Sequence, residues 1–541
     1  MPAILEIVIS AVLQQRTGPN SDSNAAGDRV LAAEAHRAAG RLDKAETSLR
    51  KNLRAYPNHA RTLHGLGLIA RDKGRLDRAI QLLEKAVAAA PLAADIGCDL
   101  GLALKAAGRH DEAIAAQARV TDLLPNSAPA WSNHGTALSA AKRYDDAIAS
   151  FTKALSLAPN TAELHYNLAN AQLALGDLQG AEAAFVRTLE LSPGHAGALE
   201  NLGCALKEQG RLAEAEDLLR SACALYPADS DLRWNHALAL LMSGKYPEGW
   251  MAYEARRAIP GFTIKPQPLP PWDGGDLAGR RLLVHAEQGF GDTIQFCRYL
   301  DRLSSLQGDI VVQVPPRLLP LMRSLKIKAE ITDNTKAAAR CDVEAPMMSL
   351  PHLLGPAQPF WPDDGAYLTA DADRIAFWKD RLAGHDGLTI AIAWQGDPGY
   401  RADRTRSLPL AAFAPLADLP GIRLISLQQG PGRSQIAAVP WRDTILDLGE
   451  DIDQDGAFLD SAAILATADL MITSDTALAH LAGAVGAPVG VALSRIPDWR
   501  WGAQGDSCGW YSTMHLFRQE TPGDWDSVFN TIATALKEKL T

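Results

Sequence analysis

Six prolines in the first half of this 541-residue chain follow one another at intervals of 34 residues. They are Pro57, Pro91, Pro125, Pro159, Pro193 and Pro227. A second series at the same period consists of Gly40, Gly74, Gly108, Gly176, Gly210 and Gly244, with Lys142 at the missing position. A third consists of Ala45, Ala79, Ala113, Ala147, Ala181 and Ala215. Three residue types that share one period indicate an internal repeat, so this half must fold as stacked copies of one unit.

Each unit predicts two helices joined by a tight turn. The glycine ends the first helix in a left-handed conformation, and the proline stops the second helix. The alanine lets the paired helices approach closely. Because one unit cannot bury its apolar stripe alone, neighbouring units must stack into an α-solenoid. Residues 24–261 resemble seven tetratricopeptide repeats.

One position of the first helix carries asparagine in four successive units, namely Asn133, Asn167, Asn201 and Asn235. An amide offers both a donor and an acceptor, so it can pair with the backbone of a peptide of any sequence. At about 0.5–1.5 kcal/mol per bond, four such amides would give modest affinity for an extended acceptor. The tetratricopeptide superhelix of O-GlcNAc transferase, which these repeats resemble, holds protein substrates with a similar ladder. The alternative is that the asparagines only bond neighbouring helices.

Composition excludes some classes of protein. The net charge of −10 and the pI near 5.7 argue against a nucleic-acid-binding protein. The six cysteines form no C-x-x-C pair, which is typical of small core residues in a reducing compartment. We therefore expect a cytoplasmic protein.

The N-terminal segment, residues 1–23, combines an apolar run at 4–13 with a connector. The run is shorter than the roughly 18 residues that a membrane span requires, and no basic region precedes it. We interpret it as a docking or oligomerisation helix rather than a membrane anchor, and expect no membrane span. Residues 16–27 are predicted to be a flexible connector.

The second half begins after a proline-rich linker, residues 262–280, which we expect to be a semi-rigid spacer. Short apolar runs then alternate with helical stretches, which predicts parallel, doubly wound sheets. The expected strands are 282–285, 310–314, 388–394, 422–427, 469–473 and 488–493. A break near 355–387 separates two halves, 281–375 and 376–541. Ligands of such folds lie outside the carboxyl ends of the strands.

The first expected strand runs through Gly289 and Gly291 into a helix. A strand that turns over glycines into a helix leaves free backbone N–H groups, which suits an anionic ligand. Asp292 lies at this turn, where a carboxylate can act as a base. The glycine pattern lacks the full dinucleotide fingerprint, so it is weak evidence by itself.

Two stretches of the second half suggest a phosphate site. A loop that begins at Gln395 carries Arg401, Arg404 and Arg406, whose guanidinium groups match phosphate oxygens, although a solvated basic loop is the alternative.

The strand at 469–473 leads into a helix that we expect Ser474 or Asp475 to cap. Thr476 and His480 are four residues apart on one face of it, beside an expected anion site. The alternative for His480 is a structural role.

GFGDTIQFCRY, RADRTRSLPL, SDTALAHLAGAVGAPV and the aromatic tail from residue 498 together resemble the transferase half of bacterial tetratricopeptide-linked glycosyltransferases. These are similar to heptosyltransferases and, more distantly, to O-GlcNAc transferase. The architecture is similar to that of flagellin glycosyltransferases, whose repeats recruit flagellin and whose catalytic half adds a nonulosonic acid. The resemblance implies a GT-B fold of two Rossmann-like halves, with a final helix at 524–540 that returns to the first half.

The resemblance also implies roles for individual residues. Asp292 matches the general base proposed for heptosyltransferases, and Asp475, Thr476 and His480 match their donor-binding segment. Heptosyltransferases carry a lysine where this chain has loop arginines, which leaves the phosphate contacts open.

The activity implied is inverting transfer of a sugar from a nucleotide sugar, as co-substrate, to Ser or Thr of a protein such as flagellin, without a metal or further cofactor. Fixed cationic groups can replace a metal, and we interpret the D-x-D triplets at 371–373 and 451–453 as solvated loops. Trp499, Trp501 and Trp510 could stack on a base or sugar, or pack in the core against the final helix. A non-catalytic scaffold and a transferase for a lipid or polysaccharide acceptor are the alternative functions.

Overall fold

The computed structural model describes residues 21–259, 262, 267–355, 365–399 and 403–540. The predicted apolar run at 4–13 lies outside these residues. The chain divides into two compact units, Met1–Ala205 and Leu206–Thr541. In the described residues, no helix has both the length and the apolar character needed to cross a bilayer.

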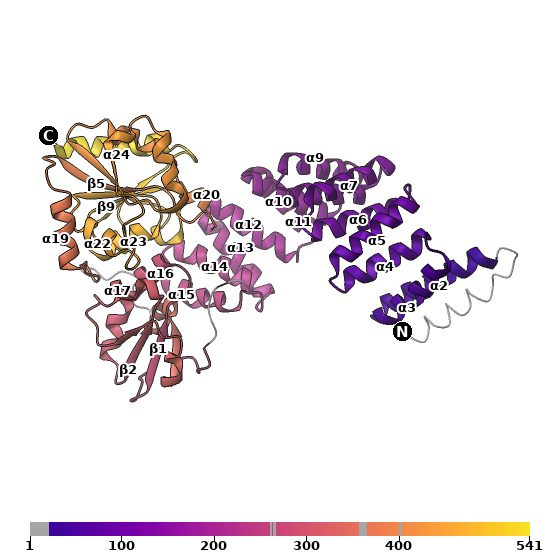
Figure 1. Ribbon diagram of the computed structural model, residues 1–541, viewed down its shortest axis with the longest axis horizontal. Coiled ribbons are helices and arrows are strands. Elements are labelled where there is room, and N and C mark those ends of the chain that lie inside the picture. Colours follow the sequence, from indigo (N-terminus) through magenta and orange to yellow (C-terminus); the bar gives the residue numbers. More distant parts are fainter. Residues whose placement is uncertain (1–20, 260–261, 263–266, 356–364, 400–402, 541) are drawn as a thin grey trace. The chain divides into compact units, whose positions relative to one another are not determined.

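The first unit consists of antiparallel helix pairs (Figure 1). Its helices are α2 (Ser21–Ala38), α3 (Leu42–Ala55), α4 (Ala60–Asp72), α5 (Leu76–Ala89), α6 (Ala94–Ala106), α7 (His110–Leu123), α8 (Ala128–Ala140), α9 (Tyr144–Leu157), α10 (Ala162–Leu175), α11 (Leu178–Leu191) and α12 (Ala196–Glu208), the last of which extends into the second unit. The second unit begins with α13 (Leu212–Leu225), α14 (Ser230–Met242) and α15 (Tyr246–Tyr253), so helices for all seven predicted repeats are present.

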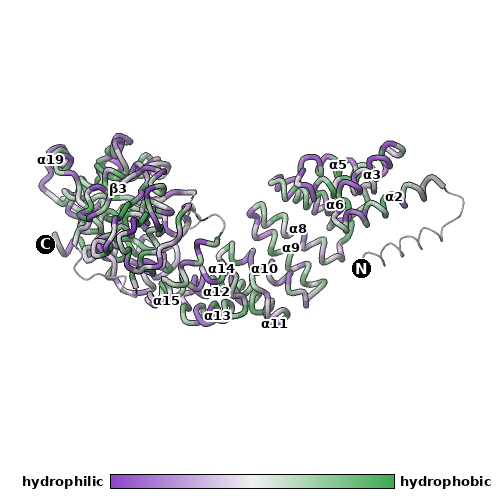
Figure 2. Tube along the Cα trace, turned by 90° about the horizontal axis from the view of Figure 1, so that it is seen from below, coloured by the Kyte–Doolittle hydropathy of each residue, from purple (hydrophilic) through white to green (hydrophobic). Residues whose placement is uncertain are grey.

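The repeat chemistry is confirmed residue by residue. Every glycine of the series has a positive φ, between 71° and 92°, and Lys142 adopts the same left-handed conformation at 61°. All six alanines of the series are completely buried. Hydrophobic and hydrophilic residues alternate along these helices (Figure 2), so that each helix has an apolar face to bury against its neighbours.

The predicted connector at 16–27 is wrong for its described part, because α2 begins at Ser21. Ala26 is 2% exposed, and its carbonyl oxygen accepts a hydrogen bond from Asn52 Nδ2 at 3.1 Å. Packing on the second helix of the first repeat therefore extends α2 through the polar residues at its start.

Two parallel sheets follow the repeats in the second unit. The first has the strand order β3-β2-β1-β4. Its strands are β1 (Arg281–His285), β2 (Asp309–Gln313), β3 (Glu330–Thr332) and β4 (Val343–Pro346). Leu282 pairs with Ile310 on one side and with Val343 on the other, so β1 is central and fully hydrogen-bonded.

The second sheet has the order β10-β9-β8-β5-β6-β7. Its strands are β5 (Leu388–Ala393), β6 (Ile422–Ser426), β7 (Ile445–Asp447), β8 (Leu470–Thr473), β9 (Val489–Leu493) and β10 (Met514–Arg518). The chain therefore starts in the middle of the sheet and winds outward in both directions, which is the order of a doubly wound fold. All six predicted strands are present in the two sheets, whereas β3, β4, β7 and β10 were not predicted.

Helices and short 3-10 turns surround the sheets. The α-helices of seven or more residues are α16 (Phe290–Phe296), α19 (Ala372–Arg381), α22 (Leu459–Leu465), α23 (Ala477–Ala484) and α24 (Trp525–Leu540). The 3-10 turns and four-residue helices are η1 (Glu254–Ala258), η2 (Cys297–Ser305), η3 (Pro316–Leu318), α17 (Leu319–Met322), η4 (Ala337–Arg340), η5 (Met347–Ser349), α18 (Leu350–Leu353), α20 (Asp403–Arg406), η6 (Leu410–Phe413), α21 (Ala414–Ala417), η7 (Gly430–Ala438), η8 (Arg442–Thr444) and η9 (Trp499–Trp501).

The final helix differs from its expected position. Phe529 of α24 packs on Phe413 with 4.3 Å between ring centroids, and both belong to the hydrophobic cluster around Trp394. These contacts place α24 on the second sheet, whereas the resemblance implied a return to the first. The apolar side chains of α24 fill the surface beside β5 and β10 of its own sheet.

The linker is also not a simple spacer where the structure describes it. Pro270 accepts a hydrogen bond from the Glu344 backbone, and the Trp272 N–H donates to the Glu344 carbonyl at 2.7 Å. The Trp272 side chain is 2% exposed. Residues 270–272 therefore extend the first sheet beside β4, because proline can occupy an edge position that needs no N–H donor.

The last repeat packs directly on the sheet region of its unit. Trp250 of α15 contacts Trp499 edge to face, with 5.3 Å between ring centroids, and contacts Phe296 at 5.8 Å. Trp499, Trp501 and Trp510 are only 3–5% exposed. The tail aromatics are therefore core residues, and their described ring contacts are with α15, α16 and α23 rather than with the final helix.

Candidate active site

The carboxylate of Asp292 is held at the start of α16. Its Oδ2 accepts a hydrogen bond from the Gly289 N–H at 3.0 Å, and its Oδ1 accepts one from Arg500 Nη2 at 2.6 Å. Arg500 also donates to Asp498 at 2.8 Å and to Gln295 Oε1 at 2.7 Å. Asp292 is thus fixed in orientation by a helix start and by an arginine from far along the chain.

Burial raises the pKa of Asp292 above its usual value, although the Arg500 guanidinium and the Gly289 N–H oppose the change. A raised pKa brings a carboxylate closer to the range in which it can accept a proton at neutral pH. Each carboxylate oxygen retains a second lone pair beyond the bond described above. The arrangement is therefore compatible with a general base.

Gly291 lies where α16 meets α23. A β-carbon at position 291 would lie 3.3 Å from Ala477 Cα and 3.3 Å from His480 Cδ2. Glycine therefore permits this close contact between a helix that follows the first sheet and a helix that follows the second. The two motifs that were singled out from sequence meet at this point, where Gly291 and His480 are 189 positions apart along the chain.

The start of α23 has no side-chain cap. Thr476 is the N-cap residue, and no side-chain hydrogen bond closes the first turn. The prediction that Ser474 or Asp475 caps the helix is therefore wrong, because the extended backbone of Thr476 delays the helix start. Ser474 is fully buried, and its Oγ has no hydrogen-bond partner in the described part of the chain. The N–H groups without a side-chain cap and the helix dipole make this end suited to an anion.

The carboxyl of Asp475 lies in a strongly charged setting. Burial and the neighbouring Asp498 carboxylate raise the pKa of Asp475 to about 6, although Arg406 and Arg500 oppose the rise. Among the loop arginines, Arg406 has its Nε 3.5 Å from Asp403 Oδ1. Arg404 belongs to α20, but its side chain, like the whole of Arg401, lies outside what the structure describes.

His480 is 5% exposed and stacks on Trp501, with 5.1 Å between ring centroids and 17° between the planes. Burial holds its pKa well below the usual value, so the imidazole is neutral. Its Nδ1 lies 3.0 Å from the Tyr511 hydroxyl. The nearby Tyr367 hydroxyl donates to the Ile294 carbonyl at 2.9 Å.

Tyr511 fixes the orientation of the His480 ring. Burial raises the pKa of the Tyr511 phenol well above the usual value, so the hydroxyl stays protonated and shares a hydrogen bond with His480 Nδ1. The histidine was predicted from the sequence, but its contact with Tyr511 was not.

Gln395 follows β5 and joins a group of glutamines. Its N–H donates to Gln428 Oε1 at 2.9 Å, and its Oε1 accepts from Gln435 Nε2 at 3.2 Å. Gln428 Nε2 in turn donates to the Gln395 carbonyl at 3.0 Å. Gln428 and Gln435 were missed, although the polar run after β6 that contains them was a signal for a strand-end site.

The strand order explains why these groups converge. The direction of winding in the second sheet reverses between β5 and β8, which are neighbours. Gln395 and Arg406 follow β5, whereas residues 474–480 follow β8. Ligands of doubly wound sheets bind outside the carboxyl ends of the strands at such a reversal. The predicted donor-binding residues therefore lie at the position that the topology favours.

The two asparagines of the series whose hydrogen bonds are described bond neighbouring helices, which was the alternative to binding an acceptor peptide. Asn133 Nδ2 lies 2.9 Å from Cys98 Sγ, and Asn201 Nδ2 donates to Asn170 Oδ1 at 2.7 Å. Both bonds join successive repeats. Asn167 and Asn235 are half-buried. Binding of an acceptor by these four residues stays a prediction.

One D-x-D triplet is not a solvated loop. Asp453 is 8% exposed, and its Oδ1 accepts hydrogen bonds from the Asp460 and Ser461 N–H groups at 2.7 and 3.1 Å. It therefore closes the start of α22. Asp371 caps α19 by accepting from the Arg374 N–H. Within the described ranges, no three His, Cys, Asp or Glu side chains are grouped so that they could hold a metal ion.

Comparison with known proteins supports the repeat assignment. Tetratricopeptide-repeat models match residues 29–91, 65–128, 132–196 and 195–226. The chain is 31% identical to Protein FlbA of Caulobacter vibrioides over 57% of its own length, and it spans 55% of that relative. Residues within 29–226 therefore form tetratricopeptide repeats, and the chain is similar to Protein FlbA over part of the length of that relative.

Solved structures show partial likenesses. A crystal structure of MamA is 27% identical, with a TM-score of 0.28, and covers 30% of this chain and 94% of its own. PilF of Pseudomonas aeruginosa is 18% identical, with a TM-score of 0.35, over 40% of this chain and 97% of its own. YrrB, described as a TPR protein with an unusual peptide-binding site, is 20% identical, with a TM-score of 0.30. The match covers 35% of this chain and 95% of the YrrB chain.

Proposed function

We propose that the chain is a protein O-glycosyltransferase with a GT-B fold, whose Rossmann-like halves are residues 281–375 and 376–541. It transfers a sugar from a nucleotide sugar to a Ser or Thr hydroxyl of a protein acceptor. The observation that carries the proposal is the contact of α16 with α23 at Gly291, which brings Asp292 close to the uncapped start of α23. A base and an anion site that lie together are what such a transfer requires.

The donor would bind through its phosphates. We assign the phosphate contacts to the N–H groups at the start of α23, the Ser474 hydroxyl and the guanidinium of Arg406, which also lies 3.5 Å from Asp403 Oδ1. The imidazole of His480 is a further polar group on the same helix. Because these groups are fixed in the fold, they can stabilise the leaving phosphate without a metal ion.

The transfer would be a single displacement. The acceptor hydroxyl oxygen forms a bond to the anomeric carbon as the bond from that carbon to the phosphate oxygen breaks. The hydroxyl proton passes to Asp292, and the negative charge leaves with the nucleotide phosphate. Such a displacement inverts the configuration of the sugar. Asp292, held by Arg500 and Gly289, would contribute about 10²–10⁴-fold as a positioned base.

The acceptor would be an extended protein segment held by the repeats, which stack as peptide-binding tetratricopeptide arrays do. Flagellin as acceptor and a nonulosonic acid as the sugar are the specific form of this proposal, and they rest on the family resemblance of the transferase motifs.

The test is intact-mass analysis of flagellin co-expressed with the wild-type chain, with Asp292→Asn, or with Asp301→Asn. The wild type and Asp301→Asn, which changes an exposed residue of η2, are expected to add the same mass. Asp292→Asn keeps a hydrogen-bond acceptor for Gly289 or Arg500 but cannot take a proton, so the added mass should disappear. Calorimetric titration with candidate nucleotide sugars should show unchanged binding in this variant.

Two results would count against the proposal. If the wild type adds no mass to any flagellin or other extended acceptor while binding no nucleotide sugar, the transferase function is wrong. If Asp292→Asn retains wild-type turnover, the transferase function stands but Asp292 is not its base.

A further inference from the structure

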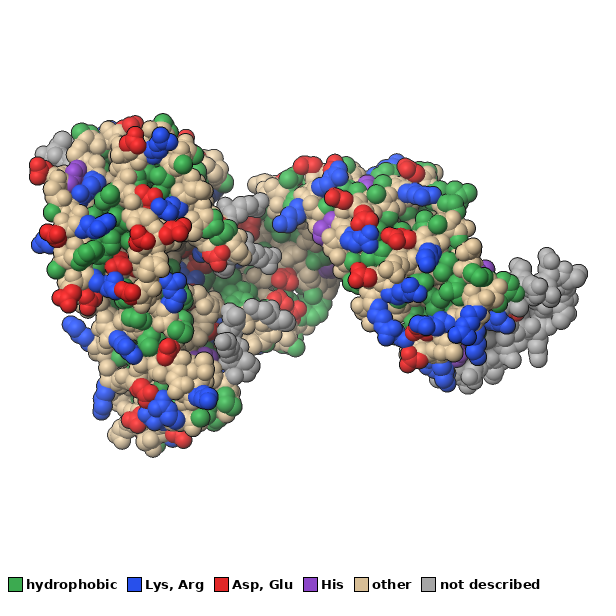
Figure 3. Space-filling view, viewed as in Figure 1, with side chains coloured by type: hydrophobic (Ala, Val, Ile, Leu, Met, Phe, Trp, Pro, Cys, Tyr) green, Lys and Arg blue, Asp and Glu red, His purple; other side chains and the backbone are tan. Residues whose placement is uncertain are grey.

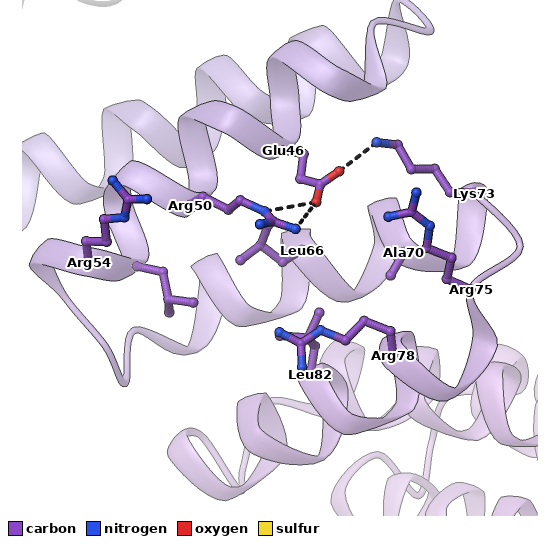
Figure 4. A pocket seen from close by; sticks show the side chains of 10 residues that line it. Glu46, Arg50, Arg54, Leu66, Ala70, Lys73, Arg75, Arg78 and Leu82 are labelled. Carbon is purple, nitrogen blue, oxygen red and sulfur yellow. Dashed lines mark hydrogen bonds and ion pairs between the residues drawn. The ribbon is translucent and has the colours of Figure 1, made fainter.

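A pocket of about 360 Å³ lies between α3, α4 and α5 in the first two repeats (Figure 4). Five of its lining residues are cationic, namely Arg50, Arg54, Lys73, Arg75 and Arg78. Leucines from the same three helices, including Leu66 and Leu82, form its apolar floor. The pocket contains none of the residues in the asparagine series and belongs to neither sheet, so the proposed transfer does not use it.

The pocket carries excess positive charge. Among the described residues, Glu46 is the single acidic residue that lines it, and its carboxylate is shared between Arg50 Nη2 at 2.5 Å and Lys73 Nζ at 2.6 Å. Arg54, Arg75 and Arg78 are exposed, and no carboxylate of the described residues forms an ion pair with them. Three guanidinium groups therefore remain available to an anionic ligand.

The surrounding region has the same sign of charge. Residues 24–89 contain 13 Lys and Arg against 7 Asp and Glu, a net charge of +6, although the whole chain carries −10. Figure 3 shows Lys and Arg side chains gathered over the first repeats, around α3 and α4. A local positive field in an acidic protein attracts anionic partners to this end.

We propose that this pocket binds an acidic segment of a partner polypeptide. Its Asp or Glu carboxylates would pair with Arg54, Arg75 and Arg78, and an apolar side chain between them would rest on Leu66 and Leu82. Guanidinium groups suit this role because they bind carboxylates with two parallel hydrogen bonds. The interaction goes beyond the proposed transferase activity and would recruit a partner by its charge.

The shape of the pocket favours a peptide over other anions. No aromatic side chain in the described part of the chain lines it, whereas sites for single-stranded nucleic acid usually stack bases on aromatic rings. The cations surround a concave space, so a flat membrane surface would reach the rim but not the floor. An extended peptide can place acidic and apolar side chains inside the pocket.

The test uses the full-length chain and a fluorescein-labelled peptide of alternating acidic and leucine residues, followed by fluorescence anisotropy. A lysine-for-acid counterpart of the peptide is the ligand control. Arg54→Gln, Arg75→Gln and Arg78→Gln are combined in one pocket variant. Lys44→Gln, Lys51→Gln and Lys85→Gln, which remove the same charge from exposed positions of these repeats outside the pocket, form the matched control.

The acidic peptide is expected to bind the wild type, and the pocket variant should weaken it by about tenfold or more, against less than about twofold for the control variant. Affinity should also fall as salt rises from low to physiological concentration. If both variants lost peptide affinity equally, the proposal would be wrong, because the overall positive charge of these repeats and not the pocket would then attract the peptide. The proposal would also be wrong if the acidic peptide did not bind. It would be wrong as well if oligonucleotides or anionic vesicles bound more tightly than the peptide and the pocket variant weakened that binding.

Discussion

The repeats and the sheet region of this chain are held together over very different distances along the sequence. In the first unit, His64 bonds to Asp99 at 2.8 Å and Asn133 contacts Cys98, and both pairs are 35 residues apart. In the sheet region, Arg500 reaches Asp292 across 208 residues. Each repeat thus depends on itself and its neighbours, whereas the candidate site depends on segments from both sheets and from the tail.

The difference predicts where substitutions act. In the repeats, a change should alter one helix pair and its immediate neighbours, because stability is a sum of local terms. In the sheet region, a change in one buried contact should affect elements far along the chain. The predictions below test this contrast, beginning with the largest expected effect.

Arg256→Met should cause the largest loss of stability. Arg256 in η1 is fully buried and binds Glu287, beside the glycine turn, with Nη2 to Oε1 at 2.7 Å and Nε to Oε2 at 3.2 Å. Methionine would leave Glu287 charged and unpaired in the core, which costs about 3–5 kcal/mol of unfolding free energy. Urea unfolding should show this loss.

Arg340→Met is the matched control, because its pair with Glu330 is exposed and should contribute less than about 1 kcal/mol. The double variant with Glu287→Met should recover much of the loss. If Arg256→Met costs no more than the control, the end of the repeats does not stabilise the glycine turn.

Ala147→Leu tests whether a change in one repeat affects only that repeat and its neighbours. Ala147 is completely buried between the helices of one repeat, so added methyl groups should cost about 1–3 kcal/mol by overpacking. Ala149→Leu in the same helix α9 is exposed and should have little effect. Hydrogen exchange should show loosening in α8, α9 and their neighbours, and no change in the sheets. Loosening that extends to the sheets would show that the repeats are not energetically local.

The same contrast explains what could be predicted from sequence. A 34-residue period specifies every repeat, because the helix ends and the close contacts recur at fixed positions. Six strands were predicted because apolar residues dominate each of these segments. β3 and β7 have three residues each and β4 ends in Pro346, so they lack the length that identifies a strand. β10 alternates polar and apolar residues within the aromatic tail.

The candidate site was predicted only in its local parts. Asp292 and His480 belong to strand–turn–helix motifs, and those motifs are visible in sequence. Arg500 and Tyr511 were missed because their roles arise from contacts with distant residues. The signal that could have found Arg500 was the pair of opposite charges, Asp498 and Arg500, inside an aromatic run that must be buried.

Asp475→Asn should make the site region more stable in a pH-dependent way. The folded-state pKa of about 6 lies above the usual aspartate value of about 3.9 in an unfolded chain. The folded state therefore holds the proton more tightly, and the wild type loses stability as the pH rises from about 4 to about 6. Asparagine cannot ionise, so the variant should be more stable by about 3 kcal/mol at pH 7, and the difference should fall below about 1 kcal/mol at pH 4.

Urea unfolding at several pH values between 4 and 7 measures this difference. Asp506→Asn changes an exposed position of the same sheet region, so its unfolding free energy should depend on pH as that of the wild type does. A constant difference between Asp475→Asn and wild type across this range would contradict the raised pKa.

Lys142→Gly should give the smallest effect. It tests only the preference for glycine at the left-handed turn of each repeat. Lys142 has a φ of 61°, a left-handed conformation that costs a residue with a side chain about 1–2 kcal/mol. Glycine removes this strain but gains more freedom in the unfolded chain, so the net stabilisation should be below about 1 kcal/mol. The reciprocal change, Gly108→Lys, places a side chain at a φ of 73° and should destabilise the protein. Thermal unfolding of the two variants should shift in opposite directions. A shift in the same direction would mean that the side chain at this turn contributes contacts of its own, and that the repeat turns are not interchangeable.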